Sequence, residues 1–193
     1  IVAGVVTAPS YGAAGNFRDA GAALVSATHN RLTTATASGA ATISSLLTNS
    51  QTLPLSGTLT VSTGGILQSG GTATIQSDSG TARLILGGAV ATNIAVRVNG
   101  VNDVLNFGTA ANPVNVGSAQ TGGLTKNGAG KLVIFGTNAQ TGALNINEGT
   151  LELNGTNARM AASAGVATVV RQNSFIDFNT ATAFASDPTV AAL

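Results

Sequence analysis

The chain of 193 residues has a formal net charge of only +1, and charged residues make up 8% of it. Average soluble domains contain roughly 25% charged residues, and disordered chains combine high net charge with low hydrophobicity, whereas 44% of this chain is apolar. The composition therefore indicates a folded protein and argues against a nucleic-acid partner, which would need a clustered basic face.

Two further classes are disfavoured by the residue content. The chain has no cysteine, so it has neither a disulfide framework nor a thiolate metal site. No apolar run approaches the roughly 20 residues of a membrane-spanning helix, so we expect no membrane span. The start "IVAGVVTA" lacks an initiator Met and a preceding basic segment. We therefore do not expect an intact signal peptide, and we expect a processed chain or a part of a longer protein.

The first part of the chain is the least regular. Residues 1–41 are expected to be an N-terminal segment that is irregular or forms a first coil, and residues 19–41 fit either a helix or strands. The stretch "TISSLLTN" at 42–49 is the first clear strand. The uncharged start is a candidate strand for addition to a neighbouring subunit, and packing on the chain's own first coil is the alternative. The candidate assembly residues are Ile1, Val2, Val5 and Val6.

From Gly57 onward a short unit recurs, in which glycine precedes a strand with apolar residues two positions apart. The unit reads "GTLTV", "GTATI", "GKLVI" and "GTLEL". Turn pairs such as Gly-Gly and Asn-Gly separate it from other short strands. The other predicted strands are at 84–86, 93–98, 104–107 and 114–116.

Regular short strands suit a sandwich, a barrel or a solenoid. Aromatic residues make up only 4% of the chain, and there is no Trp, which fits a narrow interior of Val, Ile, Leu and Ala better than a wide sandwich core. We therefore predict an all-β parallel solenoid over residues 42–180, followed by a tail or linker at 181–193. Antiparallel hairpin meanders stay open, because Asn-Gly also favours hairpins.

The candidate reactive residues do not assemble into a recognisable catalytic or metal motif. Glu148 and Glu152 are the closest pair of acids, and we expect them to be solvated surface charges separated by a turn. His29 is the only histidine and is expected to be an exposed polar residue in an irregular segment. The turn "NGVND" at 99–103 is only weakly suited to calcium. We expect no enzyme activity, no cofactor and no metal.

One stretch, "GGLTKNGAGKLVIFGTNAQTGALNINEGTLELNG" at 122–155, resembles the passenger-associated transport repeat, also called the autotransporter-associated β-strand repeat. Related features begin near residue 42. The sequence departs from the pattern at Lys131, where threonine is usual, and in "NAQTG", which lacks a tyrosine. The matching residues are Gly123, Leu124, Thr125, Lys126, Gly128, Gly130, Leu132, Asn138, Thr141, Gly142, Gly149, Thr150 and Leu151.

The resemblance implies a right-handed β-helix at the outer surface of a Gram-negative bacterium or outside the cell. It also implies export through a C-terminal barrel that lies outside these residues. Our first hypothesis is a non-catalytic surface fibre or adhesin segment, whose partner is itself, by axial stacking or strand addition, or further repeats of a longer chain. The alternative is a passenger that binds host or cell-surface glycans or degrades polysaccharides.

Overall fold

The structure, a computed structural model, describes residues 16–21, 23–35, 37–87, 93–118, 122–139, 142–154, 159–160, 168–178 and 190–192. The regular elements in this part of the chain are all strands, and they form a 13-stranded and a 6-stranded sheet. Neighbouring strands run parallel, which confirms the predicted β-solenoid and removes the hairpin alternative. Its right-handedness stays a prediction. No helix capable of crossing a membrane occurs in the described part.

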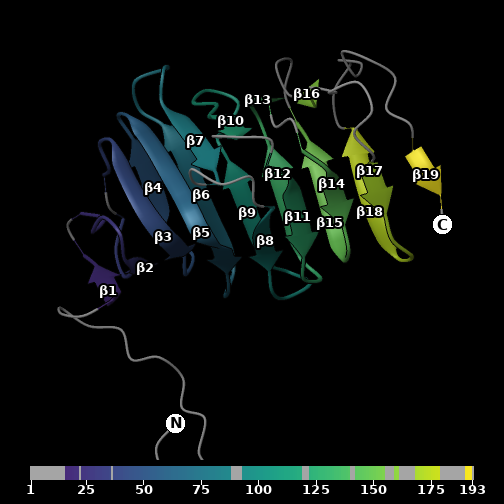
Figure 1. The fold of residues 1–193 in the computed structure, drawn as a ribbon, viewed down its shortest axis with the longest axis horizontal. Coiled ribbons are helices and arrows are strands. Elements are labelled where there is room, and N and C mark those ends of the chain that lie inside the picture. The colour runs from purple at the N-terminus through teal and green to yellow at the C-terminus, as the bar shows by residue number, and fades with distance from the viewer. Residues whose placement is uncertain are drawn as a thin grey trace, which may run out of the picture.

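The strands lie in three rows, and successive coils add strands to them in turn (Figure 1). The first row contains β7 (Arg83–Leu86), β10 (Asn115–Ser118), β13 (Thr137–Ala139) and β16 (Arg159–Met160). The second row contains β1 (Phe17–Ala20), β2 (His29–Leu32), β8 (Ile94–Val98), β11 (Leu124–Asn127), β14 (Leu144–Ile146), β17 (Thr168–Val170) and β19 (Val190–Ala192). The third row contains β4 (Thr52–Leu55), β6 (Thr72–Ser77), β9 (Val104–Phe107), β12 (Lys131–Ile134), β15 (Gly149–Leu153) and β18 (Ser174–Phe178).

Two long strands join the first and second rows into one sheet. They are β3 (Ala41–Leu47) and β5 (Thr58–Gln68). The first half of β5 pairs with β7 and its second half with β8. From β7 and β8 onward, the two rows are made of separate strands, so each later coil that is described up to β18 has three short strands.

The core consists of ladders of aliphatic side chains that point inward from successive coils. In the third row Leu105, Leu132 and Leu151 are register partners, and all three are fully buried. Neighbouring strands lie about 4.8 Å apart, so like side chains stack directly on one another. Alternation along each strand leaves the other face outside; β8, for example, alternates buried and exposed residues.

The predicted strands are confirmed in type and, within a few residues, in position. The prediction 104–107 coincides with β9, the prediction 93–98 contains β8, and 42–49 overlaps β3. Residues at the end also join the stack: β18 pairs with β15, and β19 pairs with β17. The candidate assembly residues Ile1, Val2, Val5 and Val6 lie outside the described residues.

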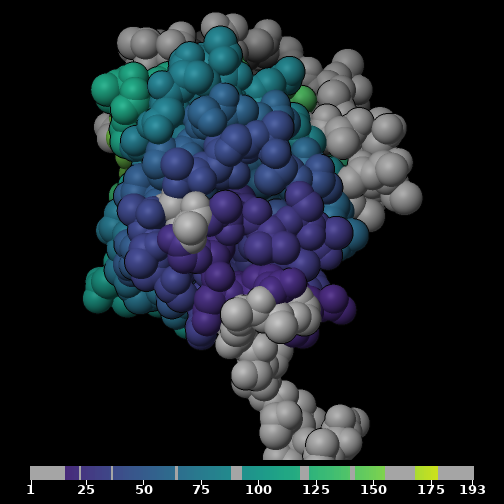
Figure 2. Space-filling model, turned by 90° about the vertical axis from the view of Figure 1, so that its left-hand side faces the viewer, coloured from purple at the N-terminus to yellow at the C-terminus, as the bar shows by residue number. Residues whose placement is uncertain are grey.

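The segment that the sequence left open contains strands. β1 and β2 pair in parallel, and β2 pairs with β3, so they begin the second row at the N-terminal end that faces the viewer in Figure 2. The expectation for His29 was wrong, because this residue is half-buried on β2. Its ring stacks on Phe17 with a centroid distance of 4.8 Å, and its Nδ1 lies 2.7 Å from the Ser45 hydroxyl.

Candidate functional site at the lysine corner

Lys126 lies on β11 with its side chain inside the solenoid. Its register partners are Val96 on β8 and Ile146 on β14, both fully buried. Lys126 is itself 0% exposed, although lysine is among the residue types least often buried. An interior position that is aliphatic in the two neighbouring coils therefore contains an amine, which needs polar partners there.

The partners of Lys126 are backbone carbonyls of two coils. Its Nζ donates to the carbonyls of Asn127 at 3.0 Å and Gly128 at 2.7 Å, in the turn that follows β11. It also donates to the carbonyl of Glu148 at 3.0 Å, in the next coil. An ammonium group has three N–H donors, so all three are used. We call Lys126, Asn127, Gly128, Glu148 and Gly149 the lysine corner.

Burial lowers the pKa of Lys126 to about 8, the nearby negative charge of Glu148 acts against this, and the positive charge of Arg97 adds to it. A lowered lysine pKa is also found in catalytic amines. Here, however, the amine is 0% exposed and its donors are bound to backbone carbonyls. The arrangement therefore fits a structural clamp between coils better than a nucleophile.

Glu148, in the next coil, forms a hydrogen bond with the turn that follows β11. Its Oε2 accepts a hydrogen bond of 3.1 Å from the backbone N–H of Gly128. The backbone of Glu148 thus accepts from Lys126, while its exposed carboxylate accepts from the turn after β11. Two consecutive corners are joined by hydrogen bonds in both directions.

Glycine is required at the corner by conformation and by space. Gly128 and Gly149 have φ values of +81° and +73°, which L-residues with side chains rarely adopt. A Cβ at Gly128 would lie 2.1 Å from the carbonyl oxygen of Val98, and one at Gly149 would lie 2.4 Å from that of Gly130. Successive corners therefore touch through their backbones, with no room for a methyl group between them.

The lysine corner lies within a segment that matches a known family of repeats. Residues 124–153 match the passenger-associated-transport-repeat family. The match confirms the resemblance, and it extends from the start of β11 to the end of β15. The comparison with curated proteins found no match, and neither did the comparison with solved structures.

Within the passenger-associated transport repeat, the apolar motif residues form the core. Leu124, Leu132 and Leu151 are fully buried. The threonines Thr125 and Thr150 are half-buried on the outer side of their strands. The leucines of the repeat therefore account for the interior, and its threonines for the outer wall.

The remaining motif residues shape the turns. Gly123 donates its N–H to Asn93 Oδ1 at 2.8 Å, and a Cβ there would lie 2.1 Å from the Ala143 carbonyl oxygen. Asn138 is 1% exposed on β13. Gly142 donates its N–H to the Gly122 carbonyl at 3.2 Å. Thr141 lies outside the described residues.

A polar ladder continues the repeat on the outside of the second row. Asn147 Nδ2 donates to Asn127 Oδ1 at 3.0 Å, and Arg171 Nε donates to Asn147 Oδ1 at 2.7 Å. Each donor in this ladder bonds the equivalent position of the preceding coil. The ladder therefore supports the coil stacking from outside, as the aliphatic ladders do from inside.

The two acids of the repeat have different environments. Glu148 is exposed, as expected, but the expectation of a solvated charge was wrong for Glu152, whose side chain is 8% exposed. Glu152 pairs with Lys131 Nζ at 2.8 Å and accepts from Asn154 Nδ2 at 2.7 Å. Lys131, the departure from the usual threonine, therefore supplies the counter-charge for a buried carboxylate in the next coil.

The oxygen-rich turn at 99–103 has a structural use. The Asp103 carboxylate accepts hydrogen bonds from the backbone N–H groups of Gly71 at 2.7 Å, Gly100 at 2.8 Å and Gly70 at 3.2 Å. Bonds from Gly71 and Gly100 hold the pKa of Asp103 below its ordinary value. Among the described residues, no group of three or more His, Cys, Asp or Glu could hold a metal ion.

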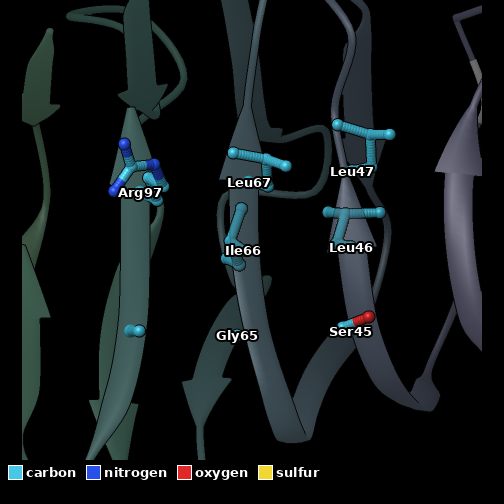
Figure 3. A pocket seen from close by; sticks show the side chains of 8 residues that line it. Ser45, Leu46, Leu47, Gly65, Ile66, Leu67 and Arg97 are labelled. Carbon is cyan, nitrogen blue, oxygen red and sulfur yellow. The ribbon is translucent and has the colours of Figure 1, made fainter. Parts of the chain in front are cut away.

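A shallow hollow of about 300 Å³ lies on the second row, between β3, β5 and β8. Leu47, Leu67 and Arg97 form one wall at the same level on three neighbouring strands (Figure 3). Beside them Gly65 has no side chain, and its neighbour in the lining, Ala95, has a small one. The hollow is therefore mainly apolar, with one guanidinium group at its edge.

The sequence pattern identified the glycines and leucines of this site but missed the burial of Lys126. Leu124, two residues earlier, is apolar and occupies the same face of the strand as Lys126. That period of two is the signal that would have placed Lys126 inside.

Proposed function

We propose that the chain is a non-catalytic structural segment of an exported passenger, displayed on the outer surface of a Gram-negative bacterium or released from it. The observation that supports this most directly is the lysine corner within the passenger-associated transport repeat. Its polar groups join one coil to the next. A scaffold that spaces or presents other parts of a surface protein needs this kind of extended, regularly bonded stack.

Further support comes from the way in which the charged groups are engaged. Lys126 bonds backbone carbonyls, Asp103 bonds backbone N–H groups, and Glu152 is paired with Lys131. Polysaccharide hydrolysis would need acids facing a groove that holds sugar, and sugar grooves favour aromatic walls. The hollow described above is lined by leucine, isoleucine, small residues and one arginine, so it does not favour the glycan alternative.

The location is tested on intact cells that express the full-length parent protein. An epitope tag is inserted next to Val101, which is 75% exposed in the turn before β9. We expect added protease to remove the tag from intact cells while a periplasmic marker survives. Protection of the tag until the outer membrane is permeabilised would contradict the proposed surface location.

The non-catalytic role is tested with the purified chain and cell-wall or capsular polysaccharides. We expect no release of new reducing ends over a day of incubation and no saturable binding. A commercial lyase or hydrolase serves as the positive control. Release of reducing ends that scales with the amount of the chain would replace this proposal by the enzymatic alternative.

A further inference from the structure

Phe175 is a large apolar side chain on the outside of the solenoid. It lies on β18, pairs in register with Thr150 and is 62% exposed. Asp177 lies two residues further along the strand, so it projects from the same face, and it is also exposed. Coils add along the stack, whereas these side chains point away from its wall. Adding a coil beside β18 would therefore leave them accessible.

The hollow on the second row has the complementary properties. Leu67, at its wall, is 36% exposed, and Gly65 beside it has no side chain that would fill the hollow (Figure 3). The Arg97 guanidinium stands at the edge, and its Nε bonds Asn99 Oδ1 at 3.2 Å. The two ion pairs formed within the described residues involve other groups, so Arg97 has no carboxylate partner in that part of the chain.

We propose that this hollow is a docking site for a second copy of the same chain, which inserts Phe175 and places Asp177 against Arg97. The apolar walls accept the ring, and the guanidinium at the edge faces the Asp177 carboxylate. An aromatic side chain with a negative charge two residues away matches an apolar hollow with a positive charge beside it. Apolar character and charge are therefore complementary between the two surfaces.

Val101 is the other strongly exposed apolar residue near an acid, and it fits the hollow less well. The nearest carboxylate along the chain, that of Asp103, already accepts three backbone N–H bonds. By contrast, Asp177 forms no ion pair within the described residues. The carboxylate beside Phe175 is therefore the better partner for Arg97.

The two surfaces lie on different rows and in different coils. The hollow belongs to β3, β5 and β8 in the second row, and Phe175 belongs to β18 in the third. Each copy thus offers one surface and accepts the other, which is a heterologous contact that links copies into a staggered chain. One side chain in one hollow buries less area than the roughly 1,000 Å² of a stable interface, so we expect weak, concentration-dependent association.

This inference goes beyond the proposed surface role and is tested separately from it, in solution with the purified chain. Sedimentation velocity over a range of concentrations at low ionic strength should show reversible association of the wild type. Phe175→Ala should weaken the association constant about tenfold or more, which corresponds to the loss of about 1.4 kcal/mol. Val101→Ala, which truncates an apolar side chain that is 75% exposed, should leave the association constant unchanged. A wild type that stays monomeric overturns the proposal.

Charge reversal tests the pairing and separates it from axial stacking of the coils. Arg97→Asp and Asp177→Arg should each weaken association, because each places like charges together. An equimolar mixture of the two variants should restore it, since each contact then joins opposite charges. Both positions are exposed, and unchanged thermal midpoints will show that the variants fold. Association that survives Phe175→Ala, or that the mixture fails to restore, overturns the assignment.

Discussion

The side chains of Lys126 and Glu148 lie in consecutive coils, and each forms a hydrogen bond with the backbone of the other's coil. Lys126 Nζ donates to the Glu148 carbonyl at 3.0 Å, and the Glu148 carboxylate accepts from the N–H of Gly128 at 3.1 Å. The charged groups of the two side chains therefore act mainly on backbone atoms. This explains how an amine can replace an aliphatic residue inside the solenoid while its neighbours Val96 and Ile146 remain apolar.

The first prediction concerns the amine of Lys126. Lys126→Met keeps most of the stem and removes the donor of three hydrogen bonds, so three carbonyls lose a partner. Removal of the desolvated charge offsets part of this loss. We expect the free energy of unfolding to fall by about 2–3 kcal/mol in urea titrations at pH 7. Arg171→Met, at an exposed position, should lower the free energy of unfolding by less than about 1 kcal/mol. Equal stability of Lys126→Met and wild type would show that the amine contributes nothing net.

The second prediction is a pH dependence. The pKa of Lys126 is lowered to about 8, so between pH 8 and the ordinary lysine value the unfolded chain binds a proton that the folded chain has released. Stability therefore increases with pH in this window, by up to about 3 kcal/mol from this group. The measurement is the difference in unfolding free energy between wild type and Lys126→Met from pH 7 to 10.5. A difference that shrinks with rising pH would mean that folding raises the pKa instead.

The third prediction concerns Asp103. Its backbone N–H partners hold its pKa below the ordinary value, so its contribution to stability is present above that value and is lost as the pH falls through the folded pKa. Asp103→Asn should lower the thermal midpoint at pH 7. The difference in thermal midpoint between this variant and the wild type should narrow below pH 4. Asp78→Asn, at an exposed position, is the matched control and should change little. A gap that is the same at pH 3 and pH 7 would rule out the carboxylate as its cause.

The fourth prediction separates strain from crowding at the glycines. Gly149 and Gly80 have nearly equal φ values, +73° and +71°, but a Cβ at Gly149 would meet two carbonyl oxygens within 2.5 Å, whereas one at Gly80 meets nothing within 4 Å. Gly80→Ala should therefore cost about 1–2 kcal/mol of unfolding free energy, from conformation alone. Gly149→Ala should cost about 3 kcal/mol or more, because the stacked backbones must separate. Similar losses in both variants would mean that the corners are not in tight contact.

The period of two in the apolar residues was enough to predict short strands, and the turn pairs were enough to delimit them. Leu132 and Leu151 follow that period, and both lie in the core of the third row. The low aromatic content indicated a narrow interior, which the aliphatic ladders fill. The sequence did not distinguish helix from strands over residues 19–41, because threonine, serine and glycine there weaken the local preference for either. In the structure, pairing of β2 with β3 favours strands.

Charged side chains mark the limit of sequence reasoning in this protein. The positions of strands and turns follow from the sequence alone, because backbone preference and alternation are local properties. The groups that make burial of Lys126 and Glu152 favourable are visible in the tertiary structure alone, because they come from a neighbouring coil. The Glu148 carbonyl accepts from the lysine, and Lys131 of the preceding coil neutralises Glu152. A buried charge is stabilised by the groups around it, and in a solenoid many of those groups are distant in the sequence but adjacent in the stack.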